Sequence, residues 1–154
     1  MKDLNKVENI VLVSLADKFC KGVAVSLAGK LDMYNADAKE MVTYDLINPK
    51  EVLEKCGIEY LKKRERGVIS SMSEFQNAVI SISFELFKDN CDLFEKSCVC
   101  YLFLPLNFAE GAINEIDYKF RHQFLTEKAD KIIFLDSKLK KNAVAGIIAQ
   151  LKGE

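Results

Sequence analysis

The chain has 154 residues, a length that fits one domain, so we expect a single domain over residues 1–154. Apolar residues make up 49% of the sequence and charged residues 29%, which is typical of a globular protein and excludes a disordered chain. The formal net charge is only −1, so no overall field favours nucleic acid or an anionic membrane surface, and we expect neither as a partner.

Strand-length apolar runs alternate with segments of helical periodicity. Residues 10–13 form a β-branched run without polar alternation, which is typical of a central strand covered on both faces. A helix follows, with an apolar stripe at Ala24, Leu27, Ala28 and Leu31. A short extended piece over residues 33–36 then precedes Asp37, whose carboxylate can cap the next helix.

The second half continues this alternation. The remaining predicted elements are helices over residues 50–56, 59–75 and 139–151 and strands over residues 78–82, 99–104 and 131–135. Pro49 and Gly57 mark the start and end of the first of these helices, and Pro105 stops the second strand. Strands separated by helices pair in parallel with right-handed crossovers, so the sequence predicts a three-layer α/β/α sandwich.

The five cysteines are scattered through a chain long enough to need no disulfides, which indicates reduced thiols and a cytoplasmic protein. Cys98 and Cys100 alternate along an apolar strand, so we expect packed thiols and no metal site. Residues 1–9 lack the apolar core of a signal peptide. The thirteen uncharged residues 97–109 are too few to span a bilayer.

Chemistry is expected after the first strand, because ligands of open parallel sheets bind beyond the carboxyl ends of the strands. Residues 14–22 read S-L-A-D-K-F-C-K-G. A strand that leads through a loop into a helix is also the setting of the phosphate-binding G-x-x-x-x-G-K-[ST] loop. The position in the chain is therefore right for that loop, although the residues differ.

Over nearly its whole length the chain resembles the shikimate kinases, small P-loop kinases of aromatic amino acid biosynthesis that transfer a phosphoryl group from ATP to shikimate. The L-A-x-x-L pattern appears at residues 27–31, and Asp37 falls at the first Asp of the D-x-D motif. Residues 57–65 approximate G-E-x-x-F-R-x-x-E, and residues 121–130 look like R-x-P-L-Y-x-x-x-A-D. The resemblance implies a P-loop NTPase-like fold with a five-stranded parallel sheet in the order 2-3-1-4-5.

On the nucleotide side of this resemblance, four loop positions have changed. Ser14 and Phe19 stand at the two loop glycines, where bare backbone must wrap the phosphates. Cys20 replaces the Lys that neutralises the transferred phosphoryl group. Lys21 replaces the Ser or Thr whose hydroxyl binds Mg²⁺. We therefore expect a degenerate loop that serves as a structural turn.

Two lysines of this segment, Lys18 and Lys21, remain candidate nucleotide-binding residues, because they return positive charge to a helix N-terminus. Asp17 opposes them with a negative charge, and the segment ends at Gly22. No cofactor is expected at a degenerate loop; ATP and Mg²⁺ are implied only if kinase activity survives.

The acceptor side implied by the resemblance is changed less uniformly. Asp37 is the candidate catalytic residue of an active kinase, and it fits a plain helix cap equally well. Lys39 stands at the second Asp of the motif, so a donor replaces an acceptor. Lys62 and Arg121 match the two Arg residues that hold the shikimate carboxylate, with Lys62 losing the bidentate fork. Residues 83–85, S-F-E, replace the family's glycine triplet.

Three further features bear on the candidate site. The family closes a mobile lid that carries an Arg, whereas the corresponding connection here, residues 105–120, has a mostly helical pattern and contains no Arg. We expect a reduced lid. The charged cluster of residues 62–66 is typical of a solvated helix face. His122, the single histidine, has no neighbouring Ser or Cys that would suggest a triad, so we expect an exposed helical residue.

The leading hypothesis is a shikimate kinase-like protein that is catalytically inactive and acts as a binding or regulatory protein, with a small carboxylate metabolite or a protein as partner. One alternative is a divergent but active shikimate kinase, with Asp37, Lys62 and Arg121 in the acceptor site and Lys18 or Lys21 on the phosphates. Another alternative is a carboxylate or anion sensor that uses Lys62 and Arg121 without a nucleotide.

Overall fold

The computed structural model describes residues 9–109 and 113–153. Its centre is a five-stranded parallel sheet in the order β2-β3-β1-β4-β5, as the resemblance implies. The strands are β1 (Asn9–Ser14), β2 (Tyr34–Asp37), β3 (Ala78–Ile82), β4 (Cys98–Phe103) and β5 (Lys131–Phe134). Each strand matches a predicted extended segment to within a residue or two.

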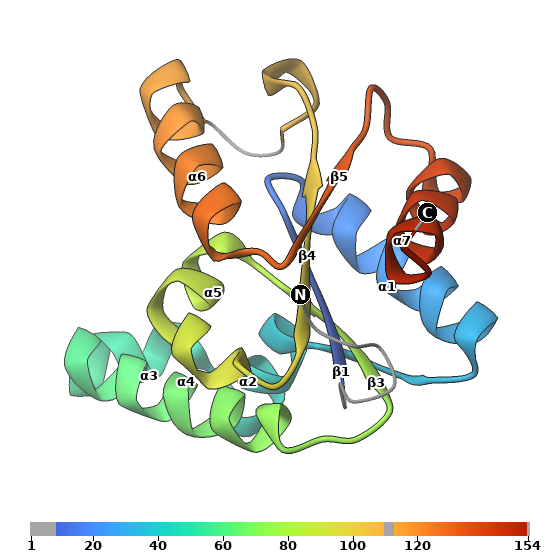
Figure 1. Cartoon of the computed structure of the whole chain (residues 1–154). Helices are drawn as coiled ribbons and strands as arrows, with labels where there is room; N and C mark the ends of the chain where they lie inside the picture. Colours follow the sequence, from blue (N-terminus) through green and yellow to red (C-terminus); the bar gives the residue numbers. More distant parts are fainter. Residues whose placement is uncertain (1–8, 110–112, 154) are drawn as a thin grey trace.

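Helices cover both faces of the sheet, so the predicted three-layer architecture is confirmed (Figure 1). The helices are α1 (Asp17–Leu31), α2 (Ala38–Leu46), α3 (Pro49–Cys56), α4 (Ile58–Ser73), α5 (Phe84–Asn90), α6 (Glu115–Lys128) and α7 (Lys140–Leu151), with short 3-10 turns η1 (Cys91–Phe94) and η2 (Leu106–Phe108). Helices α1 and α7 lie on one face, and α2, α4, α5 and α6 lie on the other.

The core follows from the position of β1, which is central and buried along its whole length. Its alternate side chains point to opposite faces of the sheet, as a strand requires. Val11 and Val13 pack with α2, α4, α5 and α6, whereas Ile10 and Leu12 pack with α1 and α7. This two-sided burial explains why the strand shows no polar alternation.

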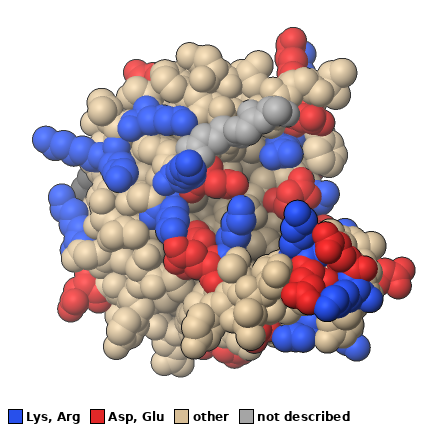
Figure 2. Space-filling model, turned by 180° about the vertical axis from the view of Figure 1, so that it is seen from behind, with Lys and Arg blue, Asp and Glu red and all other residues tan. Residues whose placement is uncertain are grey.

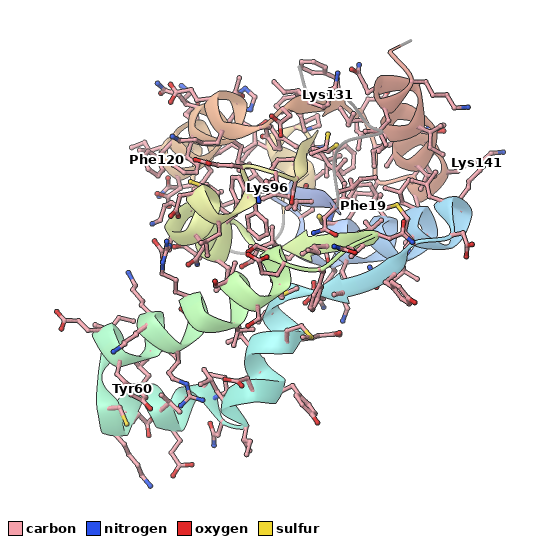
Figure 3. The ribbon with its side chains drawn as sticks, turned by 60° about the horizontal axis from the view of Figure 1, so that its bottom comes forward. Phe19, Tyr60, Lys96, Phe120, Lys131 and Lys141 are labelled. Carbon is pink, nitrogen blue, oxygen red and sulfur yellow. The ribbon has the colours of Figure 1, made fainter. Side chains whose placement is uncertain are left out.

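Helices α2, α3 and α4 form an arm that projects from the sheet, with Tyr60 near its end (Figure 3). Gly57 has a positive φ of 86°, a conformation that suits glycine, and it separates α3 from α4 at the predicted helix end. Helix α3 buries no residue, so its place depends on its neighbours in the arm.

Two parts of the fold differ from the sequence-based expectation. Helix α1 begins at Asp17, so most of the segment expected to be a loop over residues 14–22 is helical. The reason is that Phe19, Cys20 and Val23 extend the buried stripe of this helix toward its start. Helix α5 was not predicted at all.

The connection expected to carry a reduced lid is helical at residues 106–108 and 115–120, and residues 110–112 lie outside the described part of the chain. Among the described residues, no helix combines the length and apolar character needed to cross a membrane.

Candidate functional site

A pocket of about 520 Å³ opens beyond the carboxyl ends of β2 and β3, between the first turns of α1 and α2. We refer to it as the α1–α2 pocket. Its lining consists of Asp17, Lys18, Cys20, Lys21, Asp37, Lys39, Glu40, Thr43, Tyr44, Ser81, Ile82 and Ser83. The volume lies in the range of small-molecule sites, and the location is where parallel sheets bind ligands.

The passage from β1 to α1 is short. Strand β1 ends at Ser14 and α1 begins at Asp17, so only Leu15 and Ala16 connect them, and both are buried. The Ser14 hydroxyl donates to the Leu102 carbonyl oxygen at 2.9 Å and accepts from the Ala16 N–H at 3.3 Å. Ser14 therefore ties β1 to β4, and its side chain has a structural role.

Two positions of the segment that was expected to be a loop lie in the core. Phe19 is 6% exposed and Cys20 is 2% exposed, and both belong to the buried cluster on the α1 and α7 side of the sheet. Figure 3 labels Phe19. Gly22 lies in the second turn of α1, where a Cβ would meet Cε of Lys140 at 2.6 Å. Gly22 thus leaves space for the Lys140 side chain from α7. Because it lies inside a helix, no turn of the backbone requires glycine at this position.

Asp37 is both a helix cap and a pocket residue. One carboxylate oxygen accepts from the Glu40 N–H at 3.1 Å, which caps α2 as predicted. The other oxygen accepts from the Ser81 hydroxyl at 2.6 Å. Because Ser81 is buried at the end of β3, this second bond fixes the Asp37 carboxylate against the sheet. The two expectations for Asp37 are therefore compatible.

Lys21, one of the two candidate nucleotide-binding lysines, forms an ion pair with Glu40 of α2. The hydrogen bond to Glu40 is the largest cause that raises the pKa of Lys21, and the charge of Asp37 acts in the same direction. The pair spans the α1–α2 pocket from one helix to the other. Lys18 and Asp17 line the same pocket.

The two candidate carboxylate-binding residues lie outside the lining of the α1–α2 pocket, on α4 and α6. Lys62 Nζ is 3.8 Å from Asp89 Oδ2, and Arg121 Nη2 is 3.7 Å from Glu85 Oε1. Both carboxylates belong to α5, one turn apart on the same face. Helix α5, which begins where the resemblance places a glycine triplet, thus supplies internal partners to both cations.

Arg121 also lies over the Phe84 ring, with the guanidinium carbon 4.9 Å from the ring centroid. The contact is a cation–π interaction with the first residue of α5. Together with its ion pair to Glu85, it gives the guanidinium two partners from one helix.

The charged cluster of residues 62–66 makes several exposed ion pairs, and Figure 2 shows basic and acidic side chains close together on the projecting arm. Arg64 pairs with Asp45 of α2 at 3.1 Å, and Arg66 pairs with Asp92 of η1 at 2.6 Å. The cluster is solvated, as expected, and in addition joins α4 to its neighbours.

His122 differs from the expectation of an exposed residue. It is half-buried, and its Nδ1 lies 3.0 Å from the Tyr101 hydroxyl oxygen. Its ring stacks on Tyr118 with a centroid distance of 6.2 Å. No pattern in the sequence indicates the Tyr101 contact, because the two residues belong to different elements.

Cys98 and Cys100 are both buried, as expected of packed thiols. A hydrogen bond with Cys98 and, after it, burial raise the pKa of the Cys100 thiol. Within residues 9–109 and 113–153, no three His, Cys, Asp or Glu side chains gather as metal ligands would.

Solved structures provide the comparison with known proteins. The chain is similar to shikimate kinase from Aquifex aeolicus, at 20% identity over 94% of this chain and 96% of that chain, with a TM-score of 0.72. Shikimate kinase from Acinetobacter baumannii in complex with shikimate gives 17% identity over 96% of this chain and 94% of that chain, with a TM-score of 0.73.

Dephospho-CoA kinase from Campylobacter jejuni is less similar, at 13% identity over 94% of this chain and 98% of that chain, with a TM-score of 0.61. Neither a scan against protein-family models nor a search of the curated proteins finds a match to the sequence. At these identities the likeness establishes the fold alone. The chain therefore has a shikimate-kinase-like P-loop kinase fold.

Proposed function

We propose that this chain is a shikimate kinase-like protein that does not transfer phosphate, and that it acts as a binding or regulatory protein through a small molecule held in the α1–α2 pocket. The observation that carries the proposal is the short passage from β1 to α1, in which only Leu15 and Ala16 separate strand from helix. A phosphate loop needs several residues of bare backbone to surround the phosphates. This connection has too few residues to do so.

The side chains at the phosphate-binding positions support the same proposal. Cys20 is buried in the core at the position of the motif's Lys. Lys21 pairs with Glu40 at the position where the motif has a hydroxyl for Mg²⁺. These residues do not fit the phosphates of ATP or a Mg²⁺ ion, so we assign no phosphoryl transfer to them.

Two alternatives each depend on at least one cation that the structure shows in an ion pair. A divergent active kinase would use Asp37 for catalysis, with Lys18 and Lys21 on ATP, and Lys21 would first have to leave Glu40. A carboxylate sensor built on Lys62 and Arg121 would have to displace Asp89 and Glu85 of α5. Both alternatives therefore require existing ion pairs to break.

The test is a thermal-shift panel with ATP, ADP and shikimate, together with an assay of phosphoryl transfer to shikimate in the presence of ATP and Mg²⁺. A ligand of the native state raises the melting temperature with its concentration. We expect no shift with ATP or ADP and no transfer above the buffer blank. Transfer that is abolished by Asp37→Ala would overturn the proposal and establish the active kinase.

A further inference from the structure

We propose that the α1–α2 pocket binds a zwitterion of the α-amino acid type with an apolar side chain. The ammonium group is placed at Asp37, the carboxylate at Lys39, and the side chain against Ile82 and Tyr44. This inference depends on the proposed function, because it names the class of ligand for the same pocket.

The anionic side of the site is fixed in place. Each oxygen of the Asp37 carboxylate accepts one hydrogen bond, from the Ser81 hydroxyl and from the Glu40 N–H. A carboxylate has about four acceptor sites, so each oxygen keeps capacity for a further donor. The carboxylate is thus held in position before a ligand arrives, which lowers the cost of binding an ammonium group.

The cationic side of the site comes from the same junction between β2 and α2. Lys39 follows Asp37 by two residues and lines the same pocket. In the part of the chain that the structure describes, its ammonium group makes no hydrogen bond or ion pair. One carboxylate and one ammonium group from the same junction therefore line the pocket, and an amino acid carries the complementary pair of charges on a single carbon atom.

The charge balance of the pocket favours a ligand with no net charge. Its lining has three lysines and three carboxylates, and one of each is already joined in the pair of Lys21 with Glu40. A polyphosphate or a simple organic anion would meet Asp37 without a compensating positive charge of its own. A zwitterion satisfies both Asp37 and Lys39 and leaves the pair of Lys21 with Glu40 intact.

The apolar part of the ligand has a matching surface. Ile82 is buried at the end of β3, and the Tyr44 side chain on α2 is 86% exposed although it lines the pocket. A ring or branched alkyl group placed between these residues would cover apolar area of Tyr44 that water now contacts. The volume of about 520 Å³ is ample for such a side chain.

The test compares three probes that share a phenylethyl group and differ in their charged groups. L-phenylalanine carries both groups, 3-phenylpropionate lacks the ammonium group, and 2-phenylethylamine lacks the carboxylate. Calorimetric titration and thermal shift are expected to give saturable binding of L-phenylalanine and at least about tenfold weaker binding of the other two, since each loses one charged hydrogen-bond partner. L-leucine serves as a second zwitterion with a branched side chain.

Variants assign the two charges. Lys39→Met and Asp37→Asn are each expected to weaken the binding of L-phenylalanine about tenfold. Asn at position 37 can still cap α2, so folding is retained. Lys39→Arg is expected to keep the affinity, because it keeps the positive charge. Lys50→Met, on the exposed surface of α3 and outside the pocket lining, is the matched control and is expected to change nothing.

The outcomes separate this inference from the proposed function. Equal affinities for the three probes would overturn the inference of a zwitterionic ligand, and so would the absence of binding of both L-phenylalanine and L-leucine at millimolar concentration. Either result leaves the proposal of a non-catalytic protein unaffected. Phosphoryl transfer to shikimate that depends on Asp37 overturns the proposed function whichever probe binds.

Discussion

At the scale of single residues, the fully buried Tyr101 of β4 lies in contact with His122 of α6. Burial raises the pKa of Tyr101 well above its ordinary value, and its hydroxyl oxygen lies within hydrogen-bond distance of His122 Nδ1, at 3.0 Å. Tyr101→Phe removes this bond and is expected to lower the free energy of unfolding by roughly 1–2 kcal/mol. Urea denaturation measures the loss.

Tyr34→Phe is the matched control for this change, because Tyr34 is 74% exposed on the edge strand β2. Its urea midpoint is expected to equal that of the unchanged protein. If Tyr101→Phe also leaves the midpoint unchanged, the contact with His122 does not stabilise the fold.

Glu65 on α4 gives a prediction about pH. Burial is the main cause that raises its pKa above 4.5, the charge of Asp89 adds to this, and Lys62 opposes it. The folded state therefore holds the proton more tightly than the unfolded state, and this contribution to stability is lost as the pH rises from 4.5 through the raised value. Glu65→Gln is expected to stabilise the protein at pH 7 by roughly 0.5 kcal/mol or less, since solvent screens this partly exposed group.

Melting temperatures measured at several pH values test the Glu65 prediction. The gain from Glu65→Gln is expected to disappear well below pH 4.5, where the native glutamate is itself protonated. Glu59→Gln, on the exposed first turn of the same helix, serves as the control. A gain that is independent of pH would contradict the assignment.

The sequence predicts those residue contacts that are local along the chain. Asp37 was expected to cap a helix, and its cap bond spans three residues. Its bond to Ser81 spans 44 residues, and no periodicity in the sequence indicates such a pair. His122 was expected to be exposed, because no pattern along the chain indicates its contact with the buried Tyr101, which lies 21 residues away on β4. Partners brought together by the fold are outside the reach of pattern analysis.

At the scale of elements, α1 and α7 approach each other where Gly22 faces the Lys140 side chain. A Cβ at this position would lie 2.6 Å from Cε of Lys140, and this atom belongs to the flexible end of a side chain that can move aside. Alanine is better than glycine inside a helix by about 0.5–1 kcal/mol. We expect Gly22→Ala to yield this full gain in a Lys140→Ala background and a smaller gain in the unchanged protein.

Urea denaturation of the two single variants and the double variant gives the coupling energy directly. Gly29→Ala, in the same helix with no atom near its Cβ position, is the matched control. Additive effects of Gly22→Ala and Lys140→Ala would show that the lysine side chain does not pack on α1.

The elements that were predicted well have a clear apolar run or stripe in the sequence. The elements that were missed or shortened lack such a pattern. Strands β1 and β3 are continuous β-branched runs, and α7 has a clear apolar stripe. Helix α5 has seven residues, too few to establish a period, and its N-cap Ser83 and first two residues stand at the positions compared with a glycine triplet. Helix α1 starts without a side-chain cap, since Ala16 stands at its N-cap, so nothing local marked its first turn.

At the scale of the whole molecule, the near-zero net charge conceals a set of paired charges. Arg64 and Arg66 pair with Asp45 and Asp92, and Lys21 pairs with Glu40, in each case between different elements. Exposed pairs of this kind each contribute little to stability. Each pair nevertheless joins a cation to an internal carboxylate, so an anionic ligand of that cation would have to compete with this carboxylate.

Stability and phosphate binding compete for the same positions at the start of α1. Phe19 and Cys20 now pack in the core, so the combined change Phe19→Gly, Cys20→Lys and Lys21→Ser, which restores three motif positions, creates a cavity and buries a charge. We expect a loss of roughly 4 kcal/mol or more in urea denaturation and no phosphoryl transfer to shikimate. Val25→Gly, on the exposed side of α1, is expected to cost only about 1 kcal/mol. A triple variant with undiminished stability, or with measurable transfer, would mean that the first turn of α1 can still open into a phosphate loop.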